Sequence, residues 1–94
     1  MALLPTFWIY CKNTQPINAL AFDLSNGLTV YFSYKTPIAF RVDGKTTIRV
    51  NEWGPTTGKH LNAIDADKRL RVDGAIFEAR LKDAVILSFF GGVL

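Results

Sequence analysis

Three closely spaced turn signals constrain this chain more than any other feature. Ser25-Asn26-Gly27 and Val42-Asp43-Gly44 each end in glycine after Asn or Asp, which is typical of three-residue hairpin loops with a left-handed glycine. Tyr34-Lys35-Thr36 lies midway between them and is predicted to form a third loop. Apolar and polar residues alternate on either side of each loop, so residues 18–50 are predicted to form an antiparallel meander.

The three loops determine which residues pair across the strands. The predicted pairs are Leu24–Leu28, Phe22–Val30, Leu20–Phe32, Phe32–Ile38, Val30–Phe40, Arg41–Lys45, Phe40–Thr46 and Ile38–Ile48. In this register one face of the sheet is apolar, with Leu20, Phe22, Leu24, Leu28, Val30, Phe32, Ile38, Phe40, Ile48 and Val50. The other face is polar and basic, with Asp23, Thr29, Tyr31, Ser33, Ala39, Arg41, Lys45, Thr47 and Arg49.

A longer helix is predicted near the C-terminus of the sequence. Asp73 is a candidate N-cap, and Val72 and Phe77 have the spacing of a hydrophobic staple. The apolar stripe of this helix comprises Ile76, Phe77, Leu81, Ala84, Val85 and Ser88. Ala84–Phe90 also suits a β-strand, since valine, isoleucine and phenylalanine favour strands. Gly91-Gly92 would end the helix.

A sheet with one apolar face and a helix with one apolar stripe favour a single α+β domain over residues 1–94. We expect an antiparallel meander of three to five strands, with one face covered by one short and one longer helix. Phe7–Lys12 is a candidate edge strand. A chain of 94 residues with 49% apolar residues folds as one small core, which excludes disorder, repeats and a separate cofactor domain.

The cysteine and histidine content limits the chemistry of the chain. Cys11 is the single cysteine and His60 the single histidine, so neither an internal disulfide nor a closed zinc site can form. As a general base His60 would need a nucleophile and an orienting partner, for which Cys11 or an aspartate would have to lie beside it. The sequence contains no recognisable catalytic constellation. We therefore expect a cytoplasmic protein without enzymatic activity, cofactor, metal or membrane anchor.

A net charge of +3 permits weak binding to nucleic acid. The candidate residues lie on the basic face of the sheet: Tyr31, which could stack on a base, and Arg41, Lys45 and Arg49, which could contact phosphates. The alternative is that this face is the ordinary solvated side of a half-buried antiparallel sheet.

A short helix is predicted to begin after Thr56 and Thr57 and to end near Asp65. The free N–H groups of its first turn predict a candidate anion site, formed by Thr56, Thr57, Gly58, Lys59 and His60. The run is not a P-loop, because its two glycines are one residue too close and histidine follows the lysine. Alternatively, the threonines serve only as helix caps.

Two segments carry a resemblance to a known group of proteins. They are Tyr34-Lys35-Thr36-Pro37-Ile38-Ala39-Phe40 and the run from Trp53 to Asn62, which contains Thr56-Thr57-Gly58-Lys59-His60-Leu61. The chain resembles, over residues 30–65, a family of small uncharacterised proteins of bacteriophages and other viruses. This resemblance implies a viral origin and expression in an infected host cell, and it implies no activity.

Taken together, these features predict a binding or interaction module rather than an enzyme. The uncharged ends of the chain hold more apolar residues than one small core absorbs, so we expect a homo-oligomer. A host or viral protein is the other expected partner. A weak single-stranded nucleic-acid binder and a binder of small anionic ligands are the alternatives.

Overall fold

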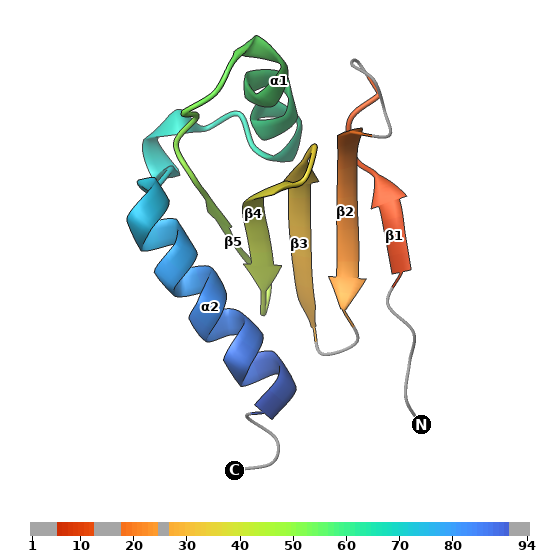
Figure 1. Cartoon of the computed structure of the whole chain (residues 1–94), viewed down its shortest axis with the longest axis vertical. Coiled ribbons are helices and arrows are strands. Elements are labelled where there is room, and N and C mark those ends of the chain that lie inside the picture. The colour runs from red at the N-terminus through yellow and green to blue at the C-terminus, as the bar shows by residue number, and fades with distance from the viewer. Residues whose placement is uncertain (1–5, 13–17, 25–26, 91–94) are drawn as a thin grey trace.

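The computed structural model describes residues 6–12, 18–24 and 27–90, and shows a five-stranded antiparallel sheet with two helices (Figure 1). The elements are β1 (Thr6–Ile9), β2 (Ala19–Leu24), β3 (Leu28–Ser33), β4 (Thr36–Val42), β5 (Lys45–Ile48), α1 (Pro55–Ile64), a short 3₁₀ helix η2 (Lys68–Leu70) and α2 (Gly74–Phe90). Neighbours in the sequence are neighbours in the sheet, so the order is β1-β2-β3-β4-β5. The predicted α+β class and meander are confirmed.

The pairing of β2 with β3 is the predicted one. Leu24 lies opposite Leu28, and Leu20 lies opposite Phe32. Gly27 has a φ of 80°, which glycine adopts without the steric cost that a Cβ would add. The rest of this loop, residues 25–26, lies outside the described residues.

The predicted register of β4 with β5 is wrong by one residue. Asp43 and Gly44 both have positive φ, 52° and 78°, and they form a two-residue hairpin turn rather than part of a three-residue loop. Val42 therefore lies opposite Lys45. Because side chains alternate between faces, this shift moves Ile48 to the opposite side of the sheet.

A β-bulge in β4 causes a second departure from the predicted pairing. Phe32 lies opposite Pro37 rather than Ile38, whereas Tyr31 lies opposite Ala39, so Ile38 is an extra residue in its strand. Further along, the predicted pair of Val30 with Phe40 is confirmed. The bulge explains how one strand can match the prediction at one end and differ from it at the other.

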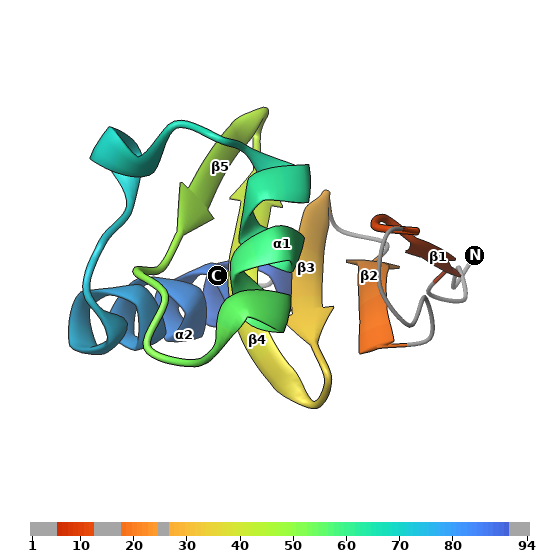
Figure 2. The same cartoon turned by 90° about the horizontal axis from the view of Figure 1, so that it is seen from above.

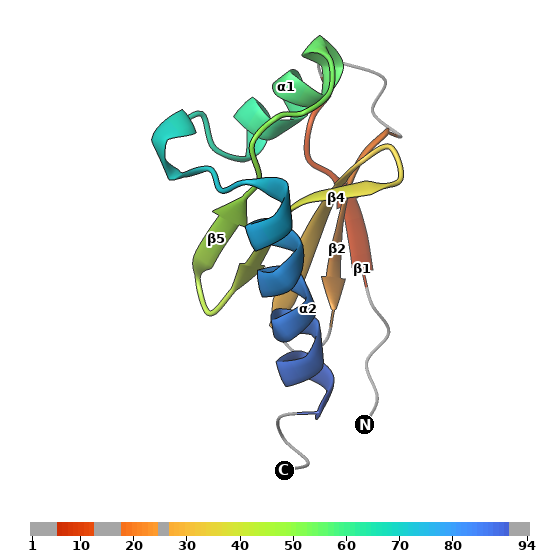
Figure 3. The same cartoon turned by 60° about the vertical axis from the view of Figure 1, so that its left-hand side comes forward.

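The two changes divide the apolar residues between both faces of the sheet. One cluster contains Ala21, Tyr31, Ile38, Ala39 and Ile48 together with Leu61 of α1. The other contains Leu28, Val30 and Phe40 together with Phe77 and Ala84 of α2. The short and the longer helix therefore pack against opposite faces rather than covering the same one. Figure 3 shows α2 running along the strands while α1 lies at one end of the sheet.

The start of α2 matches the sequence pattern. The Asp73 side chain accepts a hydrogen bond of 3.0 Å from the backbone N–H of Ile76, as an N-cap does, and Val72 and Phe77 lie in one cluster. Ala84–Phe90 is helical, so the alternative strand is excluded. Within the predicted stripe Ile76 is exposed, and Gly91-Gly92 lies outside the described residues.

A buried arginine joins α2 to the end of β5. Arg49 is 6% exposed, and its guanidinium lies 4.6 Å from the ring centre of Trp53 and 5.4 Å from that of Phe77. Its nitrogens lie 3.5 Å from carboxylate oxygens of Glu52 and Glu78. Aromatic faces and carboxylates together offset the cost of removing this charge from water.

Gly74, the first residue of α2, leaves room for that arginine. A Cβ at Gly74 would overlap the Arg49 guanidinium and lie 2.8 Å from Oε1 of Glu52. We expect Gly74→Ala to lower the free energy of unfolding by about 1–3 kcal/mol, measured by urea denaturation, because the guanidinium must leave its contacts. The control is Ala75→Leu at the exposed neighbouring position, expected to change stability by less than about 0.5 kcal/mol. Equal effects of the two substitutions would contradict this role of Gly74.

Candidate functional site

A buried hydroxyl on β3 connects the sheet to α1. Oγ of Ser33 lies 2.7 Å from Nδ1 of His60 and 3.0 Å from Oγ1 of Thr57, one turn apart on the helix. All three side chains are buried, and His60 is 0% exposed. A buried polar group is costly unless it is hydrogen-bonded, so these bonds fix how α1 sits on the sheet.

Aromatic rings surround the histidine. The rings of Tyr10 and Tyr34 have their centres 6.0 Å and 6.1 Å from that of His60. The hydroxyl of Tyr10 donates a hydrogen bond of 2.8 Å to the carbonyl of Phe32, and burial raises the pKa of this phenol, so it remains protonated. Burial also lowers the pKa of His60, and the imidazole is therefore neutral near pH 7.

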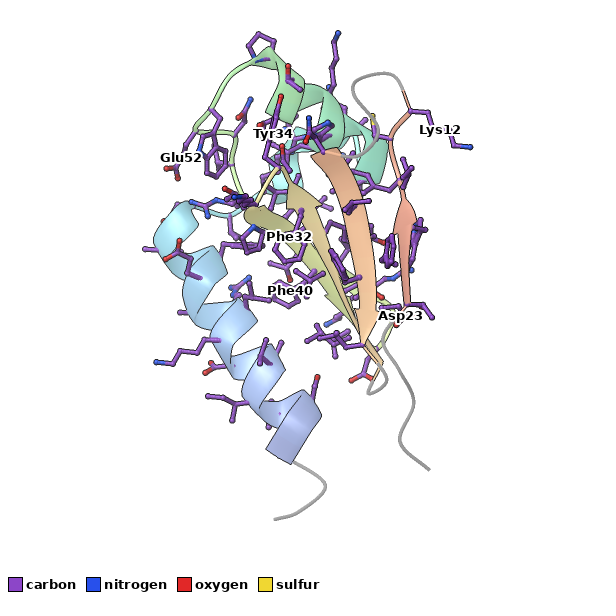
Figure 4. The ribbon with its side chains drawn as sticks, turned by 45° about the vertical axis from the view of Figure 1, so that its right-hand side comes forward. Lys12, Asp23, Phe32, Tyr34, Phe40 and Glu52 are labelled. Carbon is purple, nitrogen blue, oxygen red and sulfur yellow. The ribbon has the colours of Figure 1, made fainter. Side chains whose placement is uncertain are left out.

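Tyr34 occupies the β3–β4 turn in a strained backbone conformation. Its φ is 57°, in the left-handed region, where a side chain costs about 1 kcal/mol or more relative to glycine. Its backbone N–H donates a 2.8 Å hydrogen bond to the carbonyl of Asn18, and its side chain remains 53% exposed. Figure 4 shows Tyr34 at the end of the sheet that lies next to α1.

Trp53 is held near the start of α1 by the segment that follows β5. Oδ1 of Asn51 accepts a 2.9 Å hydrogen bond from the backbone N–H of Trp53, and Nδ2 of Asn51 donates to the carbonyl of Gly54 at 3.3 Å. This is the local side-chain-to-backbone pattern of an Asx turn. Arg49 lies over the indole, and the tryptophan is 43% exposed.

These elements surround a pocket of about 200 Å³ between the β3–β4 turn and α1. Its lining residues are Ser33, Tyr34, Thr36, Ile38, Trp53 and Thr57. Two half-exposed aromatic side chains, one aliphatic residue and three hydroxyls thus converge on one hollow. A larger pocket of about 450 Å³ lies between the β4–β5 hairpin and α2, but it lacks this combination of aromatic rings and buried hydroxyls. We therefore take the smaller pocket, the Tyr34–Trp53 pocket, as the candidate site.

The four candidate nucleic-acid-binding residues are not brought together as a surface. Tyr31 is 8% exposed and lies beneath α1, with its ring edge-on to those of Trp8 and Tyr10. Arg49 is buried among the contacts described above, whereas Arg41 and Lys45 are exposed. The structure leaves two of the four accessible: α1 covers Tyr31, and the shifted register of β5 turns Arg49 towards Phe77 of α2.

The five candidate anion-binding residues diverge from one another. α1 begins at Pro55 after Gly54, so Thr56 and Thr57 lie within the helix, and the predicted threonine cap is wrong. Thr57 and His60 point into the core, whereas Lys59 is exposed and Thr56 and Gly58 are half-buried. The helix ends at Ile64 with Asp65 as its C-cap, as predicted.

Two polar residues of α1, His60 and Asn62, make hydrogen bonds to other segments of the chain. His60 binds Ser33, and Oδ1 of Asn62 accepts a 2.9 Å hydrogen bond from Nη2 of Arg71, which ties α1 to the segment before α2. From the sequence, Cys11 and the aspartates are the candidate partners of His60, whereas the residue bonded to Nδ1 is Ser33. Ser33 sits on the predicted polar face, and only the position of α1 reveals it as buried.

Comparison with protein families places most of the chain in a known family. A family of unknown function, DUF8033, matches residues 8–79, which is more than half of the chain. The chain belongs to this family. The DUF8033 match includes every residue that lines the Tyr34–Trp53 pocket. No curated protein and no solved structure matched the chain. Among the described helices, none is long and apolar enough to cross a membrane.

The buried histidine makes stability depend on pH. Because folding lowers the pKa of His60 below its ordinary 6.5, the unfolded chain binds the proton more readily. Stability is therefore fully present above pH 6.5 and falls as the pH drops through 6.5 towards the folded pKa. We expect the free energy of unfolding to decrease between pH 7.5 and 5, measured by urea denaturation.

The matched variant is His60→Asn, which retains an amide able to bond Ser33 and removes the titrating group. We expect it to be less stable at pH 7.5 and to show a shallower slope from pH 7.5 to 5. An unchanged slope would mean that other groups cause the dependence.

Proposed function

We propose that this protein is a non-enzymatic interaction module that binds a partner protein through the Tyr34–Trp53 pocket. The observation that carries the proposal is the pocket itself, whose lining combines two half-exposed aromatic side chains with three hydroxyl-bearing residues. Tyrosine and tryptophan are enriched among residues that dominate binding energy at protein interfaces. A volume of about 200 Å³ is below the range of drug-sized ligand sites and suits one inserted side chain.

The strained backbone of Tyr34 supports the same proposal. A left-handed conformation at a residue other than glycine persists only where the surroundings enforce it, and such residues cluster at functional sites. Glycine would satisfy this turn at lower cost, yet tyrosine stands there with its ring half in solvent. The ring contacts His60 on one side, and its exposed side is available to a partner.

The biological setting of the proposal rests on the resemblance to bacteriophage and viral proteins. The two segments that carry it, residues 34–40 and 53–62, are also the two that contribute Tyr34 and Trp53 to the pocket. We propose a phage- or virus-type accessory protein that acts in the cytoplasm of the infected host, with a host or viral protein as its partner. Self-association is part of the proposal, because several large apolar side chains away from the pocket are exposed.

Binding to single-stranded nucleic acid and binding of a small anionic ligand have less support than binding of a partner protein. Binding to single-stranded nucleic acid would rest on Arg41 and Lys45, the two exposed members of the candidate set. A small anionic ligand at the start of α1 would meet Lys59 but not the inward-facing Thr57 and His60. Neither arrangement concentrates several groups on one accessible spot.

Affinity capture from infected host lysate tests the proposal with three variants and a nuclease arm. Tyr34→Gly removes the ring and its contact with His60 but relieves the strained φ, so we expect it to lose the partner and to remain folded, as checked by urea denaturation. We expect Trp53→Ala to lose the partner as well. The control is Leu70→Ala, because Leu70 is 68% exposed and lies outside the pocket. We expect this variant to retain the partner.

We expect a protein that is captured equally with and without nuclease, and that is lost in both pocket variants. Capture that depends on intact nucleic acid and falls steeply with salt would favour the nucleic-acid alternative instead. A partner that both pocket variants retain would refute the role of the pocket.

The bond between Ser33 and His60 gives the enzyme alternative a direct test, since a serine next to a histidine is the nucleophile–base pair of many hydrolases. Ser33 is 3% exposed, so we expect no labelling by a fluorophosphonate probe, read by intact mass. Labelling of the wild type that disappears in Ser33→Ala would overturn the non-enzymatic proposal.

A further inference from the structure

Among the described residues, the outer edge of β1 is short but carries no charge, bulge or covering segment to keep it from pairing with another strand. In the described part of the chain, β1 has β2 on one side and no strand on the other. Its four residues, Thr6–Ile9, are uncharged and exposed, with Phe7 at 65%, Trp8 at 39% and Ile9 at 41%. Natural edges are usually short, charged, bulged or covered, because their free N–H and C=O groups otherwise bind a further strand.

The opposite edge is protected in these ways. β5 carries Lys45, and beyond its end Val72 forms a parallel bridge with Arg49. The backbone N–H of Val72 donates to the carbonyl of Ile48 at 2.8 Å, which occupies that end of the edge. Figures 1 and 2 show β1 at the side of the sheet farthest from α2. The contrast identifies β1 as the edge open to a partner.

The hydrogen bonding within the sheet shows which backbone groups of β1 are available. Tyr10 donates its N–H to the carbonyl of Ala19 on β2 at 3.1 Å. Backbone groups of successive residues in an antiparallel strand alternate between its two neighbours. Thr6, Trp8 and Tyr10 therefore face β2, and the N–H and C=O groups of Phe7 and Ile9 face outward.

We propose that β1 pairs antiparallel with β1 of a second copy of this chain, joining two sheets across a two-fold axis. Phe7 of each copy then lies opposite Ile9 of the other, so all four outward-facing residues exchange N–H···O bonds. Trp8 lies opposite its own copy on the axis, in a pair without backbone bonds. The inference deepens the proposed self-association and does not depend on what the pocket binds.

Neighbouring registers satisfy fewer backbone groups. A shift by two residues in one direction places Ile9 opposite Pro5, which has no N–H to donate. A shift in the other direction places Phe7 opposite Cys11, which lies outside β1 and is buried. Of these registers, only the proposed one uses both donors and both acceptors of each β1 strand.

The charges beside β1 favour a second copy as the occupant of this edge. Exposed Lys12 follows one end of β1, and exposed Asp23 lies opposite Thr6 at the other end (Figure 4). Antiparallel pairing across a two-fold axis brings the Lys12 end of one copy to the Asp23 end of the other. Opposite charges then lie about two strand spacings apart at both corners, whereas a parallel arrangement would bring like charges to the same corner. An edge of four residues predicts a dimer of modest affinity.

Sedimentation with two matched substitutions tests whether β1 is the interface. Phe7 and Leu87 are almost equally exposed, at 65% and 67%, but Leu87 lies on α2. We expect a dimer at about 100 µM for the wild type and for Leu87→Lys, and a monomer for Phe7→Lys. A monomeric wild type would overturn self-association and the β1 pairing together. A dimer lost in Leu87→Lys and kept in Phe7→Lys would overturn the β1 pairing alone.

Disulfide trapping tests the register in the folded chain. In a Cys11→Ser background, Trp8→Cys should form a covalent dimer on mild oxidation, because opposing Cα atoms in a pair of this kind lie about 4.5 Å apart. Phe7→Cys is the control. The two residues at position 7, one in each copy, lie diagonally across the two strands with their Cα atoms about 8 Å apart. We therefore expect Phe7→Cys to crosslink poorly. Equal crosslinking at both positions, or faster crosslinking at Phe7→Cys, would refute the proposed register.

Discussion

The hydrogen bond between Ser33 and His60 is the interaction on which the candidate site depends. α1 brings only Leu61 and Ile64 to the apolar cluster on its side of the sheet, so apolar burial alone holds it weakly. The neutral imidazole and the Thr57 hydroxyl add directional bonds to one atom of β3. Directional bonds specify an orientation as well as an energy, and the orientation of α1 determines how far Trp53 stands from Tyr34.

α2 is attached by different forces. Phe77 and Ala84 are buried against β3 and β4, and Arg49 lies between two aromatic rings and two carboxylates. The two helices thus stabilise opposite faces of one sheet by different chemistry, polar on one side and mainly apolar on the other. Tyr31 and Val30, adjacent on β3, are both buried because the strand is covered on both faces.

The parts of the fold that the sequence predicted correctly are those where one face of a strand differs chemically from the other. Leu20, Phe22 and Leu24 alternate with smaller or polar residues, so only one register of β2 with β3 places them on the same face as Leu28, Val30 and Phe32. β4 and β5 lack this contrast, since Ile38 and Ile48 are apolar and can be buried under α1 as well as under α2. The bulge at Ile38 has no glycine to mark it, and Asp43-Gly44 suits turns of two or three residues equally.

The Tyr34–Trp53 pocket could not be predicted from the sequence, because it depends on where α1 lies relative to the sheet. Ser33 on a predicted polar face reads as solvated until a helix is placed over it, and a positive φ at tyrosine has no signature in the sequence. By contrast, the tryptophan and the threonines of the 53–57 segment stand out in the sequence. The sequence does not reveal how close the 53–57 segment lies to the β3–β4 turn, because only the tertiary fold determines that distance.

The order of the elements along the chain also bears on biosynthesis. The five strands are complete at Ile48, whereas the helix that covers Leu28 and Phe40 extends from Gly74 to Phe90. At synthesis rates of about 5–20 residues per second, the intervening stretch of about 40 residues takes roughly 2–8 s to emerge. Hairpins form within microseconds. The strands of a nascent chain can therefore pair before α2 is synthesised. During translation the apolar face that carries Leu28 and Phe40 is therefore exposed to solvent until α2 has been synthesised.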